Sequence, residues 1–460
     1  MKTAIFPIAP LALCLALAAS CAKKQPPLWQ SIKNPEVTAQ LQSFVAEKAG
    51  QANAATNEAP PGFASFFAAA EKGNWPALNH AFTELRQHAG QYEHSGQTDE
   101  RLRGTKWQTI IEVWGAFEAF GDGDAKYSSA FGNDIVGSIP PGSIYFGGTD
   151  PGRFVVTALQ KSHVNGDPFF GLTQNALADN TYLDYVRGMY GDKIYIPTAE
   201  ESQKCFDDYV ADVQRRSQLH QLKPGEDIKM VDGKPQVSGH FGVTQIDGLL
   251  AKVVFDKNPD REFYIEESFP FDWMYSYLEP HGLIMKINRQ PLSELPEDMV
   301  TQDHDYWTKY VTPMIGDWLH DDTPVGDVAA FAEKTFGKLD FTGFTGDPRF
   351  VRNAYAHRTF SKLRSSIAGV YAWRMTHART LDEKARMASA ADFAFRQAWA
   401  LCPDSPEAVF RYVNLLVQQN RFADAVTVAG TAAQMPTMQG RDGAQMRALV
   451  EQLEKFHKRK

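Results

Sequence analysis

Residues 143–154 read SIYFGGTDPGRF, an apolar run followed by two glycines and a charged turn into a second apolar run. The run before the glycines has the length and residue types of a buried β-strand. Asp150 and Pro151 then form a strong helix start, because aspartate suits the N-cap and proline suits the first helical position. The stretch therefore predicts a strand that leads directly into a helix.

The same pattern recurs further along the chain. Four more apolar runs can supply strands: PFFGLT (168–173), KIYIPT (193–198), EFYIEE (262–267) and HGLIMKI (281–287). Helical stretches at 153–163, 180–190 and 199–219 alternate with the early runs, which indicates parallel βαβ units. We therefore expect an α/β central domain with a mainly parallel sheet, and a polar, glycine-rich surface excursion at 221–247.

The flanks of this domain read as helical. Residues 63–87 predict a helical hairpin that breaks at Gly73-Asn74, and Trp107–Phe120 predicts another amphipathic helix. The C-terminal part resembles tetratricopeptide repeats in the spacing of Ala391, Phe395, Ala398 and Pro403, and again in Ala425, Ala429, Ala432 and Pro436. The expected order is a signal peptide (1–20), a lipid anchor and tether (21–62), a helical region (63–130), the α/β domain (131–300), a helical bridging region (301–385) and tetratricopeptide-like helical repeats (386–460).

The N-terminus carries a targeting signal. Lys2 precedes an apolar segment that closes on Ala18-Ala19-Ser20 directly before Cys21. This ending resembles the lipobox of bacterial lipoproteins, in which lipid would be attached to Cys21; an ordinary secretory signal is the alternative. We expect a protein of the bacterial cell envelope, held by its N-terminal lipid at the periplasmic side of the outer membrane or at an extracytoplasmic face.

Composition excludes several function classes. The 460 residues are 43% hydrophobic and 22% charged, as in a folded protein, and the formal net charge of −8 argues against a nucleic-acid surface. No Walker-type loop, GxGxxG, CxxC or HExxH is present, so we expect no cofactor and no metal. Cys205 and Cys402 fall in different predicted domains and are expected to be isolated buried thiols.

Charge is unevenly distributed in the last third of the chain. Residues 294–327 carry nine acids, whereas residues 349–381 carry seven Lys/Arg and no acid. A basic stretch of this kind can bind phosphates or anionic lipid. We favour the alternative that acidic and basic segments face one another or solvent within the molecule, because the negative charge of the first run nearly balances the positive charge of the second.

The glycine-rich turn is the candidate ligand site. Gly147 and Gly148 allow close approach to the backbone, and the free N–H groups at the following helix start attract anions. In a parallel sheet the carboxyl ends of the strands lie on one edge, where open α/β folds bind ligands. The predicted ligand-binding residues are Gly147, Gly148, Thr149, Asp150, Arg153, Gln174 and Asn175. A set of well-capped turns without a ligand is the alternative.

No catalytic residue is predicted. Glu266 and Glu267 could serve as general acid or base, but adjacent residues on a strand point to opposite faces. A catalytic carboxylate pair is therefore not expected there. No GxSxG motif is present, and the sequence spacing indicates no Cys-His pair for nucleophilic catalysis.

The stretch GSIYFGGTDPGRF…LTQNALADNTYLDYVRGMYGDKIYIPT is similar to the soluble C-terminal part of bacterial membrane proteins related to protein O-mannosyltransferases. The similarity extends over about residues 135–290, and in that family tetratricopeptide repeats follow. This chain lacks the membrane-embedded half in which the family's glycosyl transfer would occur, so no catalytic residue carries over. The resemblance implies at most a ligand-facing turn at Gly147, Gly148, Thr149 and Asp150.

These observations favour a membrane-anchored envelope lipoprotein that binds a glycan, an anionic ligand or a partner protein without chemistry of its own. The C-terminal repeats are the expected contact for a partner protein. The alternative is a carbohydrate-active enzyme, related to glycosyltransferases or hydrolases, that uses the carboxyl edge of the sheet.

Overall fold

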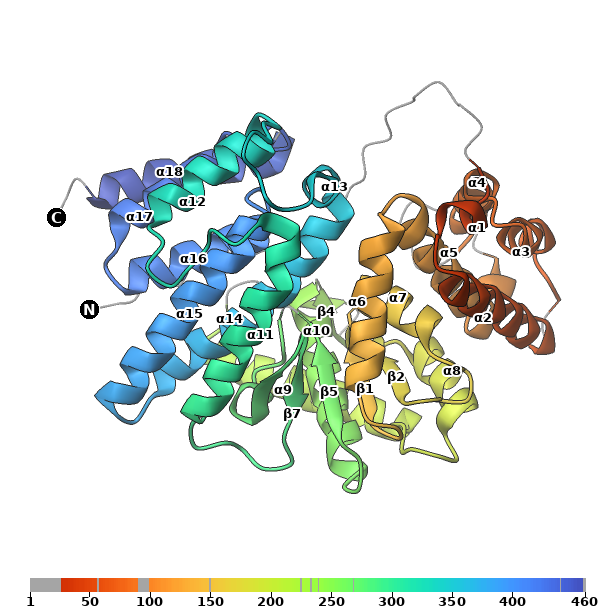
Figure 1. Ribbon diagram of the computed structural model, residues 1–460. Helices are drawn as coiled ribbons and strands as arrows, with labels where there is room; N and C mark the ends of the chain where they lie inside the picture. Colours follow the sequence, from red (N-terminus) through yellow and green to blue (C-terminus); the bar gives the residue numbers. More distant parts are fainter. Residues whose placement is uncertain are drawn as a thin grey trace. The chain divides into compact units, whose positions relative to one another are not determined.

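The computed structural model describes residues 26–55, 58–89, 99–148, 150–223, 226–231, 234–238, 240–267, 269–438 and 440–457. The chain forms two compact units that are interleaved in sequence. The first unit comprises Met1–Trp114, Lys161–Arg261 and Phe271–Trp273, and the second comprises Gly115–Gln160, Glu262–Pro270 and Met274–Lys460. Figure 1 colours the chain from its N-terminus to its C-terminus.

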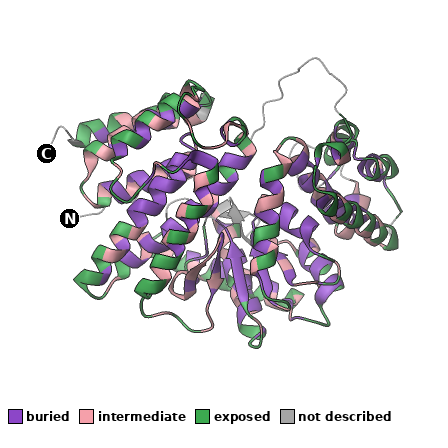
Figure 2. Cartoon of the chain, in the orientation of Figure 1, coloured by how far each residue is buried: buried purple, intermediate pink, exposed green. Residues whose placement is uncertain are grey.

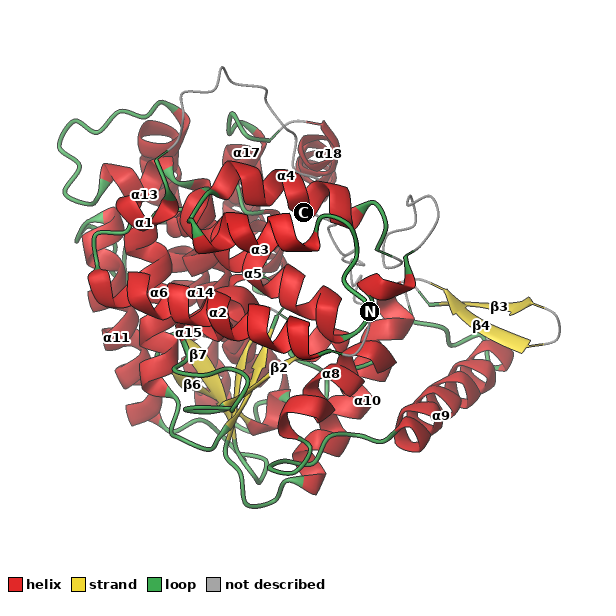
Figure 3. Ribbon diagram, turned by 90° about the vertical axis from the view of Figure 1, so that its right-hand side faces the viewer, coloured by secondary structure: helices red, strands yellow, loops and turns green. Residues whose placement is uncertain are grey.

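The first unit is mostly helical. Its elements are α1 (Leu28–Ser31), α2 (Pro35–Ala54), α3 (Phe63–Glu71), α4 (Trp75–Arg86), η1 (Glu100–Leu102), the first part of α5 (Thr105–Gly121), β2 (Phe170–Thr173), η2 (Gln174–Ala176), α8 (Asn180–Tyr190), α9 (Ala199–Gln218), β3 (Asp227–Val231), β4 (Lys234–Ser238) and α10 (His240–Lys257). The excursion predicted at 221–247 contains the antiparallel hairpin β3–β4, which Figure 3 shows beside α9.

The N-terminal helices depart in part from the prediction. The hairpin α3–α4 is confirmed: Gly73 has a positive φ of 65°, and the Asn74 side chain caps α4 by accepting a hydrogen bond from the Ala77 N–H. The predicted anchor and tether (21–62) includes one short helix over Val37–Ala49. A helix is present there: α2 is longer than expected and buries Leu41, Phe44 and other apolar side chains. Its apolar face packs in the first unit, so this part of the range is folded rather than a spacer.

The second unit holds most of the sheet and the C-terminal helices. Its elements are α6 (Ala125–Ser138), β1 (Ile144–Gly147), α7 (Pro151–Leu159), β5 (Phe263–Glu266), η3 (Tyr275–Tyr277), β6 (Leu278–His281), β7 (Ile284–Ile287), α11 (Glu297–Ile315), α12 (Val325–Ala332), η4 (Glu333–Gly337), α13 (Pro348–Arg352), α14 (Ala354–His377), α15 (Leu381–Leu401), α16 (Pro406–Gln418), α17 (Phe422–Ala433) and α18 (Gly440–His457).

The sheet confirms the α/β class but is mixed rather than mainly parallel. Its strand order is β2-β1-β5-β7-β6, with β1 parallel to β5 and β7 antiparallel to both β5 and β6. The antiparallel part arises because β6 and β7 are joined by a tight turn at Gly282, which has a positive φ of 60°. A parallel pair would need a long crossover connection instead.

One predicted strand is wrong. The run KIYIPT (193–198) has no strand in the structure. The Tyr195 backbone N–H donates to Oδ1 of Asn258, and its carbonyl accepts from Nδ2 of the same side chain. Because a side chain satisfies these backbone groups, the segment does not need a strand partner.

The C-terminal helices pack in pairs, as the alanine spacing predicts. α14 packs along α15, and α16 along α17. Ala391, Ala398, Ala425 and Ala429 are all fully buried, which lets the paired helices approach closely. Figure 2 shows α14 and α15 buried along most of their length. The predicted boundary between residues 385 and 386 falls inside α15.

Among the described residues, no helix combines the length and the apolar character needed to cross a bilayer. Cys205 and Cys402 are both buried and free, as expected.

Candidate functional site

The site lies where two parallel strands of the second unit end side by side. β1 and β5 are in register, with Gly147 opposite Glu266 at their carboxyl ends. The chain after β1 turns through Gly148 to Asp150, whose Oδ1 accepts a hydrogen bond from the Gly152 N–H at 3.0 Å and caps α7. The predicted helix start at Asp150-Pro151 is therefore confirmed.

A lysine from α14 joins three carboxylates at this edge. Lys362 Nζ pairs with Asp150 Oδ2, lies 3.0 Å from Glu266 Oε1 and lies 3.8 Å from Glu267 Oε1. The Glu266 side chain is 1% exposed and that of Asp150 is 36% exposed, so the group extends from the interior to the surface. We call Asp150, Glu266, Glu267 and Lys362 the carboxyl-edge cluster.

Burial perturbs the protonation equilibria of this cluster. It raises the pKa of Glu266 well above its usual range, and the charges of Asp150 and Glu267 raise it further against the opposing effect of Lys362. Burial alone would lower the pKa of Lys362, but attraction from the three carboxylates outweighs it, so this pKa is raised and the ammonium stays charged. Glu266 therefore holds a proton more readily than an exposed glutamate does.

One oxygen of Glu266 lacks a partner. Oε2 is buried and makes no hydrogen bond to any described residue. A buried polar atom of this kind is costly in a folded protein and calls for an explanation, such as a catalytic role or a bound water or ion.

The glycines of the turn make room for this cluster. A Cβ atom on Gly148 would lie 2.5 Å from Glu267 Oε2, and one on Gly152 would overlap Glu266 Oε2. A Cβ on Gly147 would lie 2.7 Å from the Gly152 carbonyl oxygen. The backbone is thus approached closely, as predicted for a cradle, but the groups that approach it are the protein's own carboxylates.

The structure brings together only some of the predicted ligand residues. Gly147, Gly148 and Asp150 lie at the carboxyl-edge cluster, whereas Thr149 is outside the described residues. Arg153 is buried on α7, with its guanidinium carbon 5.5 Å from the centre of the Phe154 ring.

The other predicted positions lie elsewhere in the chain. Gln174 and Asn175 belong to η2 in the first unit, where Gln174 Nε2 donates to Asn175 Oδ1 at 3.3 Å. Cys21 lies outside the described residues.

Three residues of the carboxyl-edge cluster are not among the ligand residues predicted from the sequence: Glu266, Glu267 and Lys362. The glutamates were expected to diverge, but Glu267 lies one residue past the last residue of β5, where strand alternation no longer holds. Both carboxylates consequently face Lys362. The basic segment 349–381 is predicted to face the acidic segment 294–327 or solvent. Arg364 meets that segment, since its Nη1 lies 2.7 Å from Asp303 Oδ2, whereas Lys362 pairs with carboxylates from outside it.

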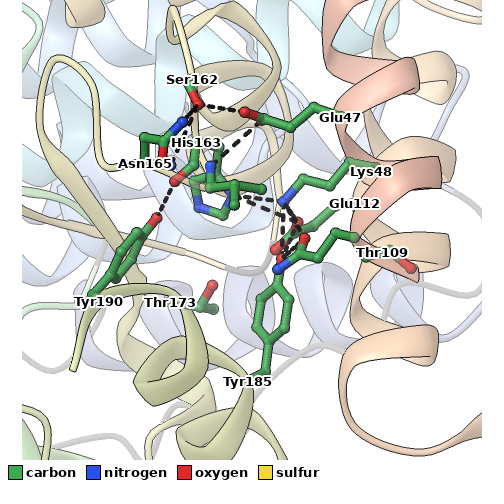
Figure 4. A network of polar contacts seen from close by, with 12 residues as sticks. Glu47, Lys48, Thr109, Glu112, Ser162, His163, Asn165, Thr173, Tyr185 and Tyr190 are labelled. Carbon is green, nitrogen blue, oxygen red and sulfur yellow. Dashed lines mark hydrogen bonds and ion pairs between the residues drawn. The ribbon is translucent and has the colours of Figure 1, made fainter. Parts of the chain in front are cut away.

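A second polar network occupies the first unit (Figure 4). Lys48 is fully buried, and its Nζ lies 2.7 Å from both Glu112 Oε2 and His163 Nδ1. It also donates to the Tyr185 hydroxyl at 2.9 Å, and this hydroxyl donates to Glu112 Oε2 at 2.7 Å. Gln51 Oε1 lies 3.4 Å from the same ammonium. The network thus links α2, α5, α8 and the loop at His163 as a structural element.

Comparison of the chain with protein-family models, with curated proteins and with solved structures found no match. The function must therefore be argued from the chemistry of the site.

Proposed function

We propose that the protein is a membrane-anchored lipoprotein of the bacterial cell envelope that binds a glycan at the carboxyl-edge cluster. The observation that carries the proposal is the buried Glu266 carboxyl, with one unpartnered oxygen, beside two further carboxylates and a lysine. The lipobox-like end at Cys21 supports the anchor. The resemblance to soluble parts of proteins related to O-mannosyltransferases supports a carbohydrate ligand.

The charges favour a hydroxyl-rich ligand over an anionic one. Ionised carboxylates only accept hydrogen bonds and an ammonium only donates them, whereas sugar hydroxyls do both. Asp150 and Glu267 face a single Lys362, so a phosphate or carboxylate would meet excess negative charge. A neutral sugar can bond to the same groups without this repulsion.

An exposed aromatic ring follows the cluster closely in sequence. Phe269 follows Glu267 by two residues and is 44% exposed. Its ring centre lies 5.1 Å from the guanidinium carbon of Arg411, which packs against one side of it. Binding sites combine an apolar surface with a few convergent polar groups, and Phe269 can supply that surface for a sugar ring.

The test is binding of the purified protein to a panel of neutral and acidic glycans, followed by calorimetry on any that bind. Asp150→Asn keeps the cap on α7 but removes a charge, and it should weaken binding by about tenfold or more, as expected for a lost charged hydrogen bond. Lys126→Met is a matched control, because Lys126 pairs with Asp347 on the surface of the same unit. No binding to any glycan, or equal affinity in Asp150→Asn, would overturn the proposal.

The raised pKa of Glu266 supports a second candidate, a carbohydrate-active enzyme. A carboxyl that burial makes hold its proton more readily than an exposed glutamate does, beside two further carboxyl groups, suits general acid catalysis of glycosyl transfer or hydrolysis. Turnover of any bound glycan, lost in Glu266→Gln while binding persists, would establish this activity. Binding with no turnover would leave the protein a glycan-binding lipoprotein.

A further inference from the structure

We propose that His357, Cys402 and Asp404 of the second unit form a binding site for a transition-metal ion of the zinc class. His357 is on α14, Cys402 is the C-cap of α15, and Asp404 lies in the turn before α16. Each offers one ligand atom, and these atoms all lie within 4.8 Å of one another.

The spacing of these atoms is close to that around a metal ion. His357 Nδ1 and Asp404 Oδ1 each lie 3.0 Å from Cys402 Sγ. A tetrahedral zinc ion with ~2.3 Å to sulfur and ~2.1 Å to nitrogen or oxygen separates its ligand atoms by about 3.5 Å. The two contacts to Cys402 Sγ would need to open by roughly half an ångström, and the His357 and Asp404 ligand atoms, which lie within 4.8 Å of each other, would need to reach about 3.5 Å. Rotations about the side-chain bonds supply movements of this kind.

The surroundings suit a metal site with one side toward solvent. Cys402 is fully buried, and His357 and Asp404 are nearly so. The exposed residues Thr437 and Arg358 both contact Asp404 Oδ2, the former by its hydroxyl and the latter at 3.8 Å. Thr437 and Arg358 orient the Asp404 carboxylate, as residues that contact the ligands do in known metal sites. They also connect the buried His357 and Cys402 to the surface.

The donor set points to zinc among the common metals. A thiolate and an imidazole favour zinc or copper over magnesium or calcium, and a carboxylate completes a set that zinc accepts. Binding would displace the Cys402 thiol proton to solvent and move the imidazole proton to Nε2. Three protein ligands leave a fourth position for water.

Sequence spacing could not show this site, and no metal was expected. His357 precedes Cys402 by 45 residues, so only the packing of α14 along α15 brings the two together. The Cys-x-Asp pair by itself is too short a pattern to predict a metal ligand.

The experiment is titration of the chelator-treated protein with Co²⁺, which gives thiolate-to-cobalt absorption in the near ultraviolet, followed by competition with Zn²⁺. We expect one cobalt ion per chain, the thiolate band, and its replacement by zinc. Cys205→Ser is the matched control, because within the part of the chain that the structure describes Cys205 is the other buried free cysteine, and it should keep the band. Cys402→Ser should lose it.

Folding of the variants is monitored by circular dichroism. If Cys402→Ser does not fold, Asp404→Asn takes its place and should weaken cobalt affinity by at least about tenfold, because a charged ligand becomes neutral. Absence of the band in the unmodified protein, or its persistence in folded Cys402→Ser, would overturn the proposal. The three residues would then form a chain of hydrogen bonds only.

Discussion

Gly152→Ala tests whether the Glu266 carboxyl lies against the start of α7. The new methyl group would overlap Glu266 Oε2, whose side chain is almost fully buried and paired with Lys362. Gly152 has no positive φ, so alanine fits its backbone conformation. The methyl group would also lie 3.3 Å from Asp150 Oδ1, a much smaller penalty than the overlap with Glu266. The variant should therefore report directly on this contact.

The expected magnitude follows from two opposing effects. Overpacking a buried site costs about 1–3 kcal/mol. Alanine in place of glycine within a helix gains up to about 1 kcal/mol. Gly152→Ala should thus destabilise the parent protein by roughly 1–2 kcal/mol. In a Glu266→Ala background the overlap is gone, and the same substitution should be neutral or stabilising.

The assay is a double-mutant cycle. The free energy of unfolding of each variant is measured in urea, and the slope of that free energy against urea concentration should be the same for all variants. Gly137→Ala in α6 is the control, because a methyl group there meets no atom within 4 Å, and its effect should not depend on Glu266. Costs of Gly152→Ala and Glu266→Ala that add to within about 0.5 kcal/mol would refute the placement of Glu266.

Three further predictions concern stability. Burial raises the pKa of Asp247 to about 7, so the folded state binds the extra proton and its stability falls as pH rises from about 4 to 7. Asp247→Asn keeps the acceptor for the Ala178 N–H and should remove a penalty on the order of 4 kcal/mol above pH 7. About 2–3 kcal/mol of this penalty should appear in the parent as the fall in unfolding free energy from pH 5 to pH 8, and the fall should be absent in the variant. Ala425→Leu should destabilise by about 1–3 kcal/mol through overpacking in α17, whereas Ala423→Leu on the exposed side of the same helix should not change the melting temperature. Lys48→Met should cost about 3–5 kcal/mol because it leaves Glu112 buried without its cation, and Glu112→Gln in the same chain should recover part of that loss in urea unfolding.

Local signals in the sequence predicted local structure well. Asp150-Pro151 starts α7 and Gly73-Asn74 separates α3 from α4, because each depends on contacts within a few residues. The direction of the later strands could not be predicted this way, since it depends on the turn at Gly282 rather than on strand composition.

The candidate site was predictable only on its β1 side. Lys362 lies 212 residues after Asp150 and was visible only as one member of a basic segment. Periodicity places such a residue on a helix face but does not say which strand end the helix reaches. Glu266 and Glu267 were noticed, but their convergence depends on the chain leaving β5 between them.

The interleaving of the two units has a consequence for how the chain can be cut. The first unit needs segments up to Trp273, the second begins at Gly115, and α5 contributes to both. A truncation after residue 114, 160 or 261 therefore leaves neither unit complete. During synthesis or export, no unit can finish folding until most of the chain is available, so folding requires pairing of distant segments rather than sequential addition of modules. Fragments of this protein should behave as partly folded and aggregation-prone species, and an informative limited-proteolysis experiment would show single nicks that leave the pieces associated.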